Sequence, residues 1–178
     1  FLLLVVGVAV WQWDTIMMMV GGKDISGEVQ TVPQIGSAQP FGVSPGPADW
    51  TGWRGSDGLG KSSMTGLKTD WSAGLDRQWQ IDYLCQDQET ATWAAPVVLG
   101  NRVYVCGRKA GHDAVFCLDI GDGKLLWKAS YAAKATANYG SGFRATPRID
   151  GDRLYTFGRS GDLVCWSLLD GAILWHAQ

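Results

Sequence analysis

The sequence predicts an all-β protein, a β-propeller with four-stranded antiparallel blades, of which about two blades and one orphan strand are present. The first observation is an internal repeat, because residues 144–177 align with residues 93–129. The second is the even spacing of Trp79, Trp127 and Trp175, with 48 residues from each to the next. A repeat of this length is typical of propellers, solenoids and related arrays. The 24 glycines and 10 tryptophans suit many tight turns and a recurring indole.

Each repeat reads as four short strands separated by turn signals. In the first copy the apolar and β-branched runs are 94–99, 101–107, 114–119 and 124–129. The second copy supplies 145–150, 152–158, 162–167 and 172–177. Gly123 and Gly171 stand in the turn before the last strand, where a residue able to take positive φ is needed. One such sheet cannot bury both faces alone, so radial stacking is expected.

The last turn of each copy resembles a known motif. Cys117-x-Asp119-x-x-Asp122-Gly123-Lys124-x-x-Trp127 resembles the tryptophan-docking motif of the pyrroloquinoline-quinone-like β-propeller repeat family, usually Ala-x-Asp-x-x-Thr-Gly-Lys-x-x-Trp. The second copy keeps Gly171 and Trp175 but has Cys165, Ser167 and Ala172 where the family prefers Ala, Asp and Lys. The resemblance implies that each indole packs over the glycine of a neighbouring motif and that its N–H finds a buried acceptor. The docking residues expected from it are Cys117, Asp119, Gly123, Lys124, Trp127, Cys165, Gly171, Trp175 and Trp79.

Residues 1–20 are expected to be a truncated transmembrane or signal-anchor segment. The first 13 residues carry no charge, and Trp11 and Trp13 suit the level of lipid headgroups. A signal-peptide core or a buried propeller strand is the alternative, since a complete span needs about 20 residues. An anchor would make the membrane a partner and would put the propeller on the periplasmic or extracytoplasmic side.

Residues 21–48 form a Gly/Pro/Ser-rich linker, and residues 49–178 form the first part of the propeller. The leading segment 49–81 contains Trp50, Trp53 and Arg54, which we expect to plug or cap the propeller, with ligand binding by Arg54 as the alternative. Residues 75–81, with Trp79, read as the outer strand of another blade. Because propellers close with about four to eight blades, the sequence is expected to be a fragment.

Composition and cysteine spacing narrow the function classes. The net charge of −2 supplies no basic field, and no nucleic-acid motif appears, so a nucleic-acid partner is not expected. The cysteines lack zinc spacing, so no metal site is expected. Buried free thiols are favoured for Cys117 and Cys165, a Cys106–Cys117 disulfide is the alternative, and Cys85 is reactive or unpaired.

One end of the propeller is the candidate binding face. The inter-blade connections 82–92 and 130–143 should share this end, here called the loop face, with the turns between the second and third strands of each blade. The residues expected there are Arg108, His112, Tyr139, Arg144 and Arg159. His112 is expected in a loop, and no residue is assigned a catalytic role. Ordinary surface loops also carry arginine, histidine and tyrosine. The pattern is therefore consistent either with a binding site or with a surface that binds no ligand.

Two functions remain open from the sequence. The first is a non-catalytic, membrane-tethered binding or scaffold propeller that offers its loop face to a protein, polysaccharide or small ligand, a role implied by the resemblance to outer-membrane-assembly scaffolds. The alternative is a dehydrogenase that holds pyrroloquinoline quinone and calcium, with the site in blades outside these 178 residues. We favour the first because no carboxylate here matches a calcium-ligand position and no Cys-Cys dipeptide occurs.

The docking motif makes the first testable prediction. In the complete protein, Trp127→Ala should cost about 3–5 kcal/mol of unfolding free energy, as for large-to-small changes in a packed core. Thermal unfolding of the variant measures this cost. An unchanged melting temperature would contradict the docking role.

Overall fold

The computed structural model describes residues 45–85, 87–135 and 140–178. The expected anchor 1–20 lies outside the described residues, as does most of the linker 21–48. Within the described ranges no helix has the length and apolar character that a membrane crossing requires. The described residues belong to one of two compact units, the one spanning Ile35–Gln178.

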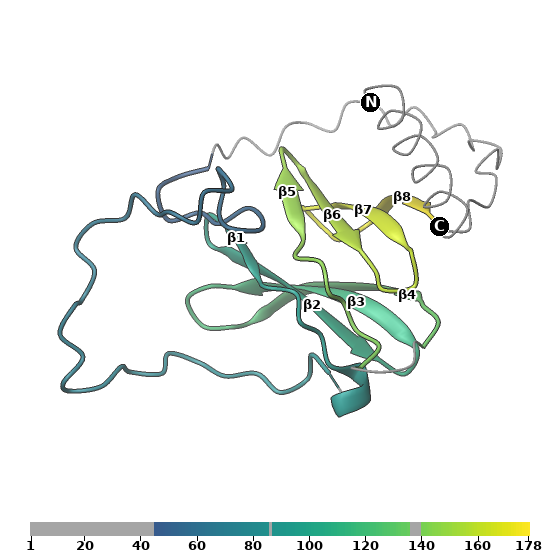
Figure 1. Ribbon diagram of the computed structural model, residues 1–178, viewed down its shortest axis with the longest axis horizontal. Coiled ribbons are helices and arrows are strands. Elements are labelled where there is room, and N and C mark those ends of the chain that lie inside the picture. The colour runs from purple at the N-terminus through teal and green to yellow at the C-terminus, as the bar shows by residue number, and fades with distance from the viewer. Residues whose placement is uncertain (1–44, 86, 136–139) are drawn as a thin grey trace, which may run out of the picture. The chain divides into compact units, whose positions relative to one another are not determined.

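The described chain forms two four-stranded antiparallel sheets, each a simple meander in strand order (Figure 1). The first sheet consists of β1 (Val97–Leu99), β2 (Arg102–Lys109), β3 (His112–Asp119) and β4 (Leu125–Ala132). The second consists of β5 (Arg148–Asp150), β6 (Arg153–Phe157), β7 (Leu163–Ser167) and β8 (Ile173–Ala177). A single 3-10 turn, η1 (Gln88–Thr90), precedes β1. The all-β fold with four-stranded antiparallel blades is therefore confirmed.

The two sheets repeat each other in detail, down to their irregularities. The turns before β2 and β6 use Gly100 and Gly151, with φ of 59° and 58°. The β3–β4 ladder shifts register after Cys117, and the β7–β8 ladder shifts after Cys165, which is the matching position of the second copy. A bulge at the same place bends each outer strand in the same way. The outer hairpins of the two blades thus share the same irregular geometry.

The β2–β3 connection is tighter than the sequence predicted. Ala110 and Gly111 form a two-residue turn with φ of 50° and 75°, so β2 and β3 extend to Lys109 and His112. Positive φ at both positions is the geometry of a type I′ hairpin, which asparagine or glycine usually signals. Because alanine occupies the first position of the turn, the sequence did not indicate a type I′ hairpin there. His112 is therefore a strand residue, and the prediction of a loop there was wrong.

The central strand β3 is buried on both faces. Val115 and Cys117 belong to a core that lies between the two sheets and includes Leu154 and Trp166 of the second sheet. On the opposite face, Phe116 and its alternate neighbours pack against residues 79–84 of the leading segment. Alternate residues of a strand face opposite sides, so one strand joins two apolar layers. Residues 79–84 cover the face that a preceding blade would cover in a propeller.

Residues 50–51 of the leading segment join the first strands of both sheets. Trp50 exchanges two backbone hydrogen bonds with Val98 of β1, at 3.0 and 2.9 Å. The carbonyl of the next residue, Thr51, accepts from the amide of Ile149 in β5 at 2.8 Å. This pairing covers the edges of β1 and β5, which would otherwise offer unpaired backbone groups. The segment thus ties the two blades together at one edge.

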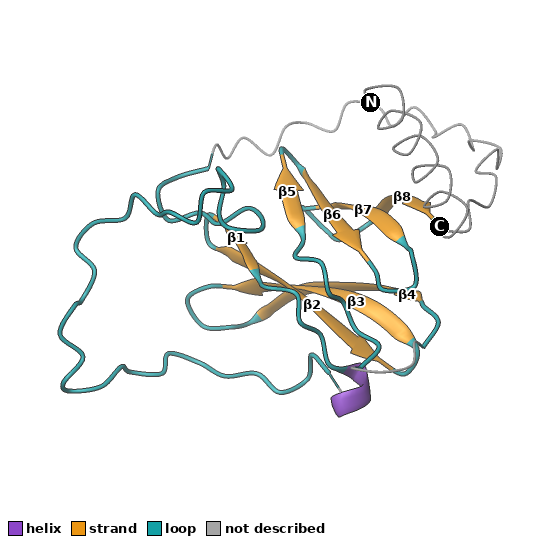
Figure 2. Ribbon diagram, in the orientation of Figure 1, coloured by secondary structure: helices purple, strands orange, loops and turns teal. Residues whose placement is uncertain are grey.

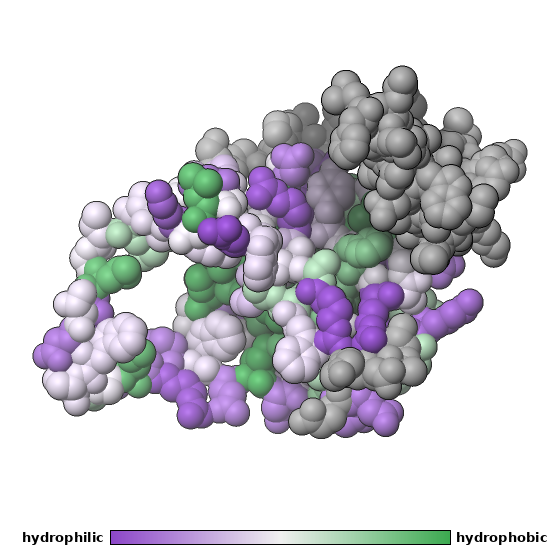
Figure 3. Space-filling model, in the orientation of Figure 1, coloured by the Kyte–Doolittle hydropathy of each residue, from purple (hydrophilic) through white to green (hydrophobic). Residues whose placement is uncertain are grey.

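Other parts of the leading segment differ from the prediction. Residues 75–81 pair with no strand in the described part of the chain, and no strand is assigned there (Figure 2). A ladder needs a partner strand, and Trp79 instead reaches the first blade through its side chain. Trp53 is 71% exposed rather than part of a plug. The segment forms a wide loop outside the sheets with several exposed apolar side chains, and Figure 3 shows hydrophobic and hydrophilic residues interspersed along it.

Candidate functional site

The indole of Trp127 lies directly over a glycine of the second blade. A Cβ atom added to Gly171 would lie only 2.6 Å from Cε3 of Trp127. The indole Nε1 donates to the backbone carbonyl of Leu168 at 3.2 Å. Any side chain at position 171 would displace the ring, so the close approach of the two blades requires glycine there.

The same contact occurs one repeat earlier. Trp79 lies over Gly123, where an added Cβ would lie 2.7 Å from Cδ2 of the indole. Its Nε1 donates to the carbonyl of Ile120 at 2.9 Å. In both cases the acceptor precedes the glycine by three residues. Trp175 occupies the equivalent place on the second blade and packs against Tyr155, with 6.0 Å between ring centroids.

Side chains of the motif shape the turn that presents each glycine. Asp119 Oδ1 accepts from the amide of Gly121 at 2.8 Å, and Asp122 Oδ1 accepts from the amide of Lys124 at 2.9 Å. In the second copy Ser167 Oγ takes the place of the first carboxylate and accepts from the amide of Leu169 at 3.3 Å. Asp and Ser side chains that accept a hydrogen bond from the backbone amide two residues later stabilise turns in this way. Ser167 therefore keeps the turn, although the family pattern has aspartate at this position.

The cysteines of the motif are buried and free. All four cysteines of the described chain are unpaired, so the Cys106–Cys117 disulfide is absent. Cys106 faces Val115 and Cys117 faces Tyr104 across the β2–β3 ladder, which leaves the two thiols diagonal rather than opposite. Burial raises the pKa of Cys117 to about 11, so its thiol is protonated at neutral pH. A protonated buried thiol acts as a small apolar group.

A buried polar cluster lies at the other end of the interface between the blades. Arg108 Nη1 and Asp113 Oδ1 are 2.6 Å apart, with side chains only 3% and 1% exposed. Arg108 also donates to the carbonyl of Ala133 at 3.0 Å, and Tyr131 donates to Asp113 at 3.3 Å. Burial raises the pKa of Asp113, while the hydrogen bonds and charge of Arg108 oppose that rise. Arg108 is therefore a structural residue, and its assignment to the binding face was wrong.

The second blade contributes a carboxylate and an imidazole to this cluster. Asp162 Oδ1 lies 2.8 Å from Nε2 of His176, and Asp162 Oδ2 accepts from Ser160. The imidazole packs on Tyr131 with ring centroids 5.1 Å apart. A Cβ on Gly158 would lie 2.4 Å from the Tyr131 hydroxyl, so this contact also requires glycine. The sequence reasoning missed this cluster, although the β2–β3 hairpin register pairs Arg108 with Asp113.

Two of the five residues predicted at the loop face come together. Arg144, just before β5, and Arg159, between β6 and β7, both donate to the carbonyl of Gly140. His112 is exposed, with Nδ1 placed 2.9 Å from the carbonyl of Ala110. Tyr139 lies outside the described residues. Trp93, which the sequence reasoning did not single out, lies under Arg144, whose Cζ is 5.3 Å from the ring centroid.

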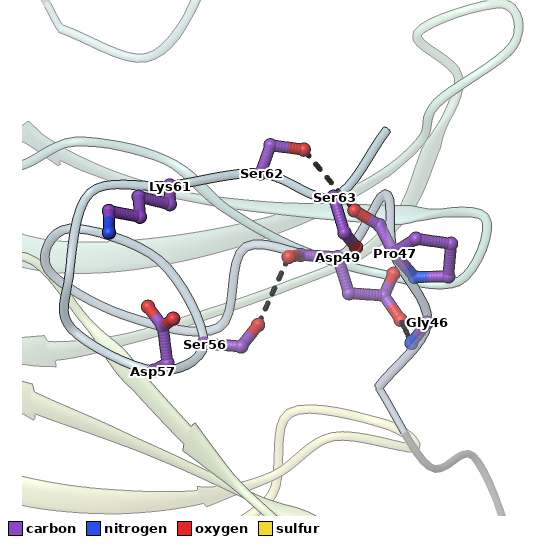
Figure 4. A pocket seen from close by; sticks show the side chains of 8 residues that line it. All are labelled: Gly46, Pro47, Asp49, Ser56, Asp57, Lys61, Ser62 and Ser63. Atoms are coloured by element: carbon purple, nitrogen blue, oxygen red, sulfur yellow. Dashed lines mark hydrogen bonds between the residues drawn. The ribbon is translucent and has the colours of Figure 1, made fainter. Parts of the chain in front are cut away.

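A shallow cavity of about 370 Å³ opens within the leading segment (Figure 4). Its polar groups hold this segment in place. Asp49 accepts from the amides of Gly46 at 2.6 Å and of Gly100 at 2.7 Å. Ser56 donates to the carbonyl of Asp49 at 3.0 Å (Figure 4). Among the described residues no group of three or more His, Cys, Asp or Glu side chains could hold a metal ion.

Comparison with known proteins supports the motif-based resemblance. Residues 111–178 match a family model described as outer membrane protein assembly factor BamB. Among solved structures, the crystal structure of BamB from Moraxella catarrhalis is 23% identical with a TM-score of 0.34, over 44% of this chain and 20% of that chain. The chain thus covers one fifth of that protein's length, and no curated protein sequence matches it.

The glycine contact gives the second prediction. Gly171→Ala should lower the free energy of unfolding by about 2–4 kcal/mol, because strain at positive φ adds to overpacking against Trp127. Gly151→Ala is the matched control, since Gly151 also has positive φ (58°) but no atom within 4 Å of an added Cβ. The control should lose only about 1–2 kcal/mol. Equal losses in urea unfolding would show that the indole contact contributes nothing.

The buried ion pair gives the third prediction. Arg108→Met should cost about 3–5 kcal/mol at neutral pH, because Asp113 is left buried without its cation. Removing the cation raises the pKa of Asp113 further, so the folded state binds more protons than the unfolded state. The loss relative to wild type should therefore grow as pH rises past the folded-state pKa of Asp113 in the wild type, which burial already holds above the ordinary carboxyl value, and level off above the higher pKa of the variant.

Urea unfolding at several pH values measures this loss, and Arg153→Met is its control. The Arg153–Asp152 pair is 3.6 Å apart with side chains 42% and 24% exposed, so its removal should cost less than about 1 kcal/mol. A loss for Arg108→Met that matches the control, or that does not vary with pH, would contradict a structural role for the pair.

Proposed function

We propose that this chain is part of a non-catalytic β-propeller that binds a partner protein during assembly of a bacterial envelope membrane. The observation that carries the proposal is the match of residues 111–178 to a family described as an outer membrane protein assembly factor. Because a fold hosts many functions, the proposal also needs a surface suited to binding. The loop face supplies that surface.

Hydrogen bonds between the two inter-blade connections hold the loop face. The carbonyl of Phe143 accepts from the amide of Trp93 at 2.8 Å and from Thr92 Oγ1 at 3.0 Å. The amide of Ser141 donates to the carbonyl of Glu89 at 2.5 Å. Loops fixed on a rigid scaffold are where proteins place binding residues. The arrangement favours recognition of a partner that contacts both connections.

The proposed location follows from the N-terminal sequence. The uncharged run that opens residues 1–20 would tether the propeller to a membrane, and the linker 21–48 would separate the two. The docking tryptophans would hold the blades in register beneath the loop face. Under this proposal the propeller faces the periplasm or another extracytoplasmic space.

Site-specific photocrosslinking in cells tests the proposal and is the fourth prediction. A photoreactive residue at position 112, which is exposed at the loop-face end of β3, should crosslink to a defined partner protein. Position 101, exposed in the turn at the opposite end of the strands, is the control and should not. Equal crosslinking from both positions, or none from either, would overturn a scaffold role at this face.

The dehydrogenase alternative predicts a different result with the same protein. Purified full-length protein supplied with pyrroloquinoline quinone and calcium should then reduce an artificial electron acceptor when an alcohol or sugar is present. The scaffold proposal predicts no such reduction. Quinone-dependent reduction would therefore replace the scaffold role with catalysis.

A further inference from the structure

The cavity of the leading segment, about 370 Å³ in volume, lies between walls that hydrogen bonds hold in place (Figure 4). One wall carries Asp49, which accepts from the amide of Gly100 at 2.7 Å and is thereby fixed to the turn before β2. The other wall carries Ser62, whose Oγ donates to the carbonyl of Pro47 at 3.3 Å and so joins the two walls. The cavity is therefore built into the folded segment.

Several polar groups of the lining are not used in holding these walls. Among the described residues, Lys61 Nζ and Ser63 Oγ have no hydrogen-bond or ion-pair partner. Asp57 uses only Oδ1, which accepts from the amide of Leu59 at 2.8 Å, so its second oxygen is left for another donor. In the view of Figure 4, Lys61 and Asp57 lie at one end of the cavity and Ser63 lies toward the other. The cavity thus offers a cationic donor, an anionic acceptor and a hydroxyl that can act as either.

The loop that carries Lys61 has the spacing of a phosphate-binding loop but not its structure. Residues 55–62 match the pattern Gly-x-x-x-x-Gly-Lys-Ser, in which free backbone amides at the start of a helix cradle phosphates. The described residues that follow this loop directly form no helix, and the amide of Gly60 donates to a carbonyl of the same loop at 2.7 Å. The carboxylates of Asp49 and Asp57 also line the cavity and would repel a phosphate.

The charges of the lining favour an uncharged ligand. An anion would meet the two carboxylates, and a cation would meet the ammonium of Lys61. A neutral ligand with several hydroxyl groups can donate to Asp57 and accept from Lys61 without bringing a charge of its own. The ring of Pro47 supplies an apolar contact for the carbon atoms of such a ligand. The volume lies at the lower end of the range for small-molecule pockets, about 300–1,000 Å³.

We propose that this cavity binds an uncharged sugar unit of a polysaccharide. Lys61 donates to one sugar hydroxyl, Asp57 accepts from another, and Ser63 contacts a third. Because the cavity is shallow, the rest of a polysaccharide chain can extend from it into solvent. The site lies beside the turn before β2, at the opposite end of the strands from the loop face, so it adds a second kind of partner to the proposed scaffold function.

Saturation-transfer-difference NMR tests this site in the full-length protein with two neutral disaccharides, maltose and diacetylchitobiose. At least one of them should bind. Lys61→Met and Asp57→Asn should each weaken that binding about tenfold, the effect of losing one charge-assisted hydrogen bond. Asparagine keeps an oxygen for the amide of Leu59, and methionine keeps the apolar stem of lysine, so the loop should stay folded. Ser63→Ala removes only a hydroxyl and gives a milder third variant.

Matched controls make the same changes outside the cavity. Lys68→Met and Asp76→Asn alter exposed residues of the leading segment that do not line it, and they should leave affinity unchanged. Thermal unfolding of each variant shows whether folding is intact. Inorganic phosphate and glucuronate should not displace the bound disaccharide, because the carboxylates of the lining repel anions.

The following outcomes would overturn the inference. Binding of neither disaccharide would exclude a neutral sugar site, and equal losses in the control and cavity variants would place the binding elsewhere. Displacement by phosphate with loss of phosphate binding in Lys61→Met would assign the cavity to anions. Crosslinking from position 112 reports on a protein partner at the other end of the strands, so the scaffold function stands or fails independently of these results.

Discussion

The architecture depends on one contact, an indole lying against a glycine of the adjacent sheet. Trp127 reaches Gly171 of the second blade, and Trp79 reaches Gly123 of the first, each with the indole N–H bonded to a carbonyl of the same turn. Because glycine has no Cβ, the ring can lie flat on the backbone, close enough for its N–H to reach a carbonyl of the turn. The even spacing of the tryptophans in the sequence reflects this contact, because each blade repeats it once.

A second contact secures the opposite end of the same interface. Tyr131 follows Trp127 by four residues along β4, so both rings leave the strand on the same face. Its hydroxyl lies against Gly158 and donates to Asp113, which is held by Arg108. One strand thus fixes the angle between the blades at two points, one apolar and one polar. Two fixed points leave little freedom for one blade to rotate against the other.

The interface that holds the blades also builds the loop face. With the blades fixed, the connection before β1 lies beside the connection before β5, and their backbone groups pair. The β6–β7 connection then brings Arg159 to Arg144 and Trp93. Binding residues on such a surface gain precision from the scaffold beneath it, because loops alone would pay a larger ordering cost on binding. Packing between the blades and the positions of the connections at the loop face are therefore parts of one arrangement.

The sequence by itself determined the repeat, the two four-stranded sheets and the glycine turns, because turn chemistry and strand periodicity are local properties. Tertiary structure decided which polar residues are structural and which are exposed. Arg108 and Arg159 occupy matching positions of the repeat, yet Arg108 is buried against Asp113, whereas Arg159 joins Arg144 on the loop face. The tight Ala110-Gly111 turn creates this difference, since it sets Asp113 opposite Arg108 across the hairpin. Burial and charge pairing depend on neighbours distant in sequence, and one chain read in order does not contain them.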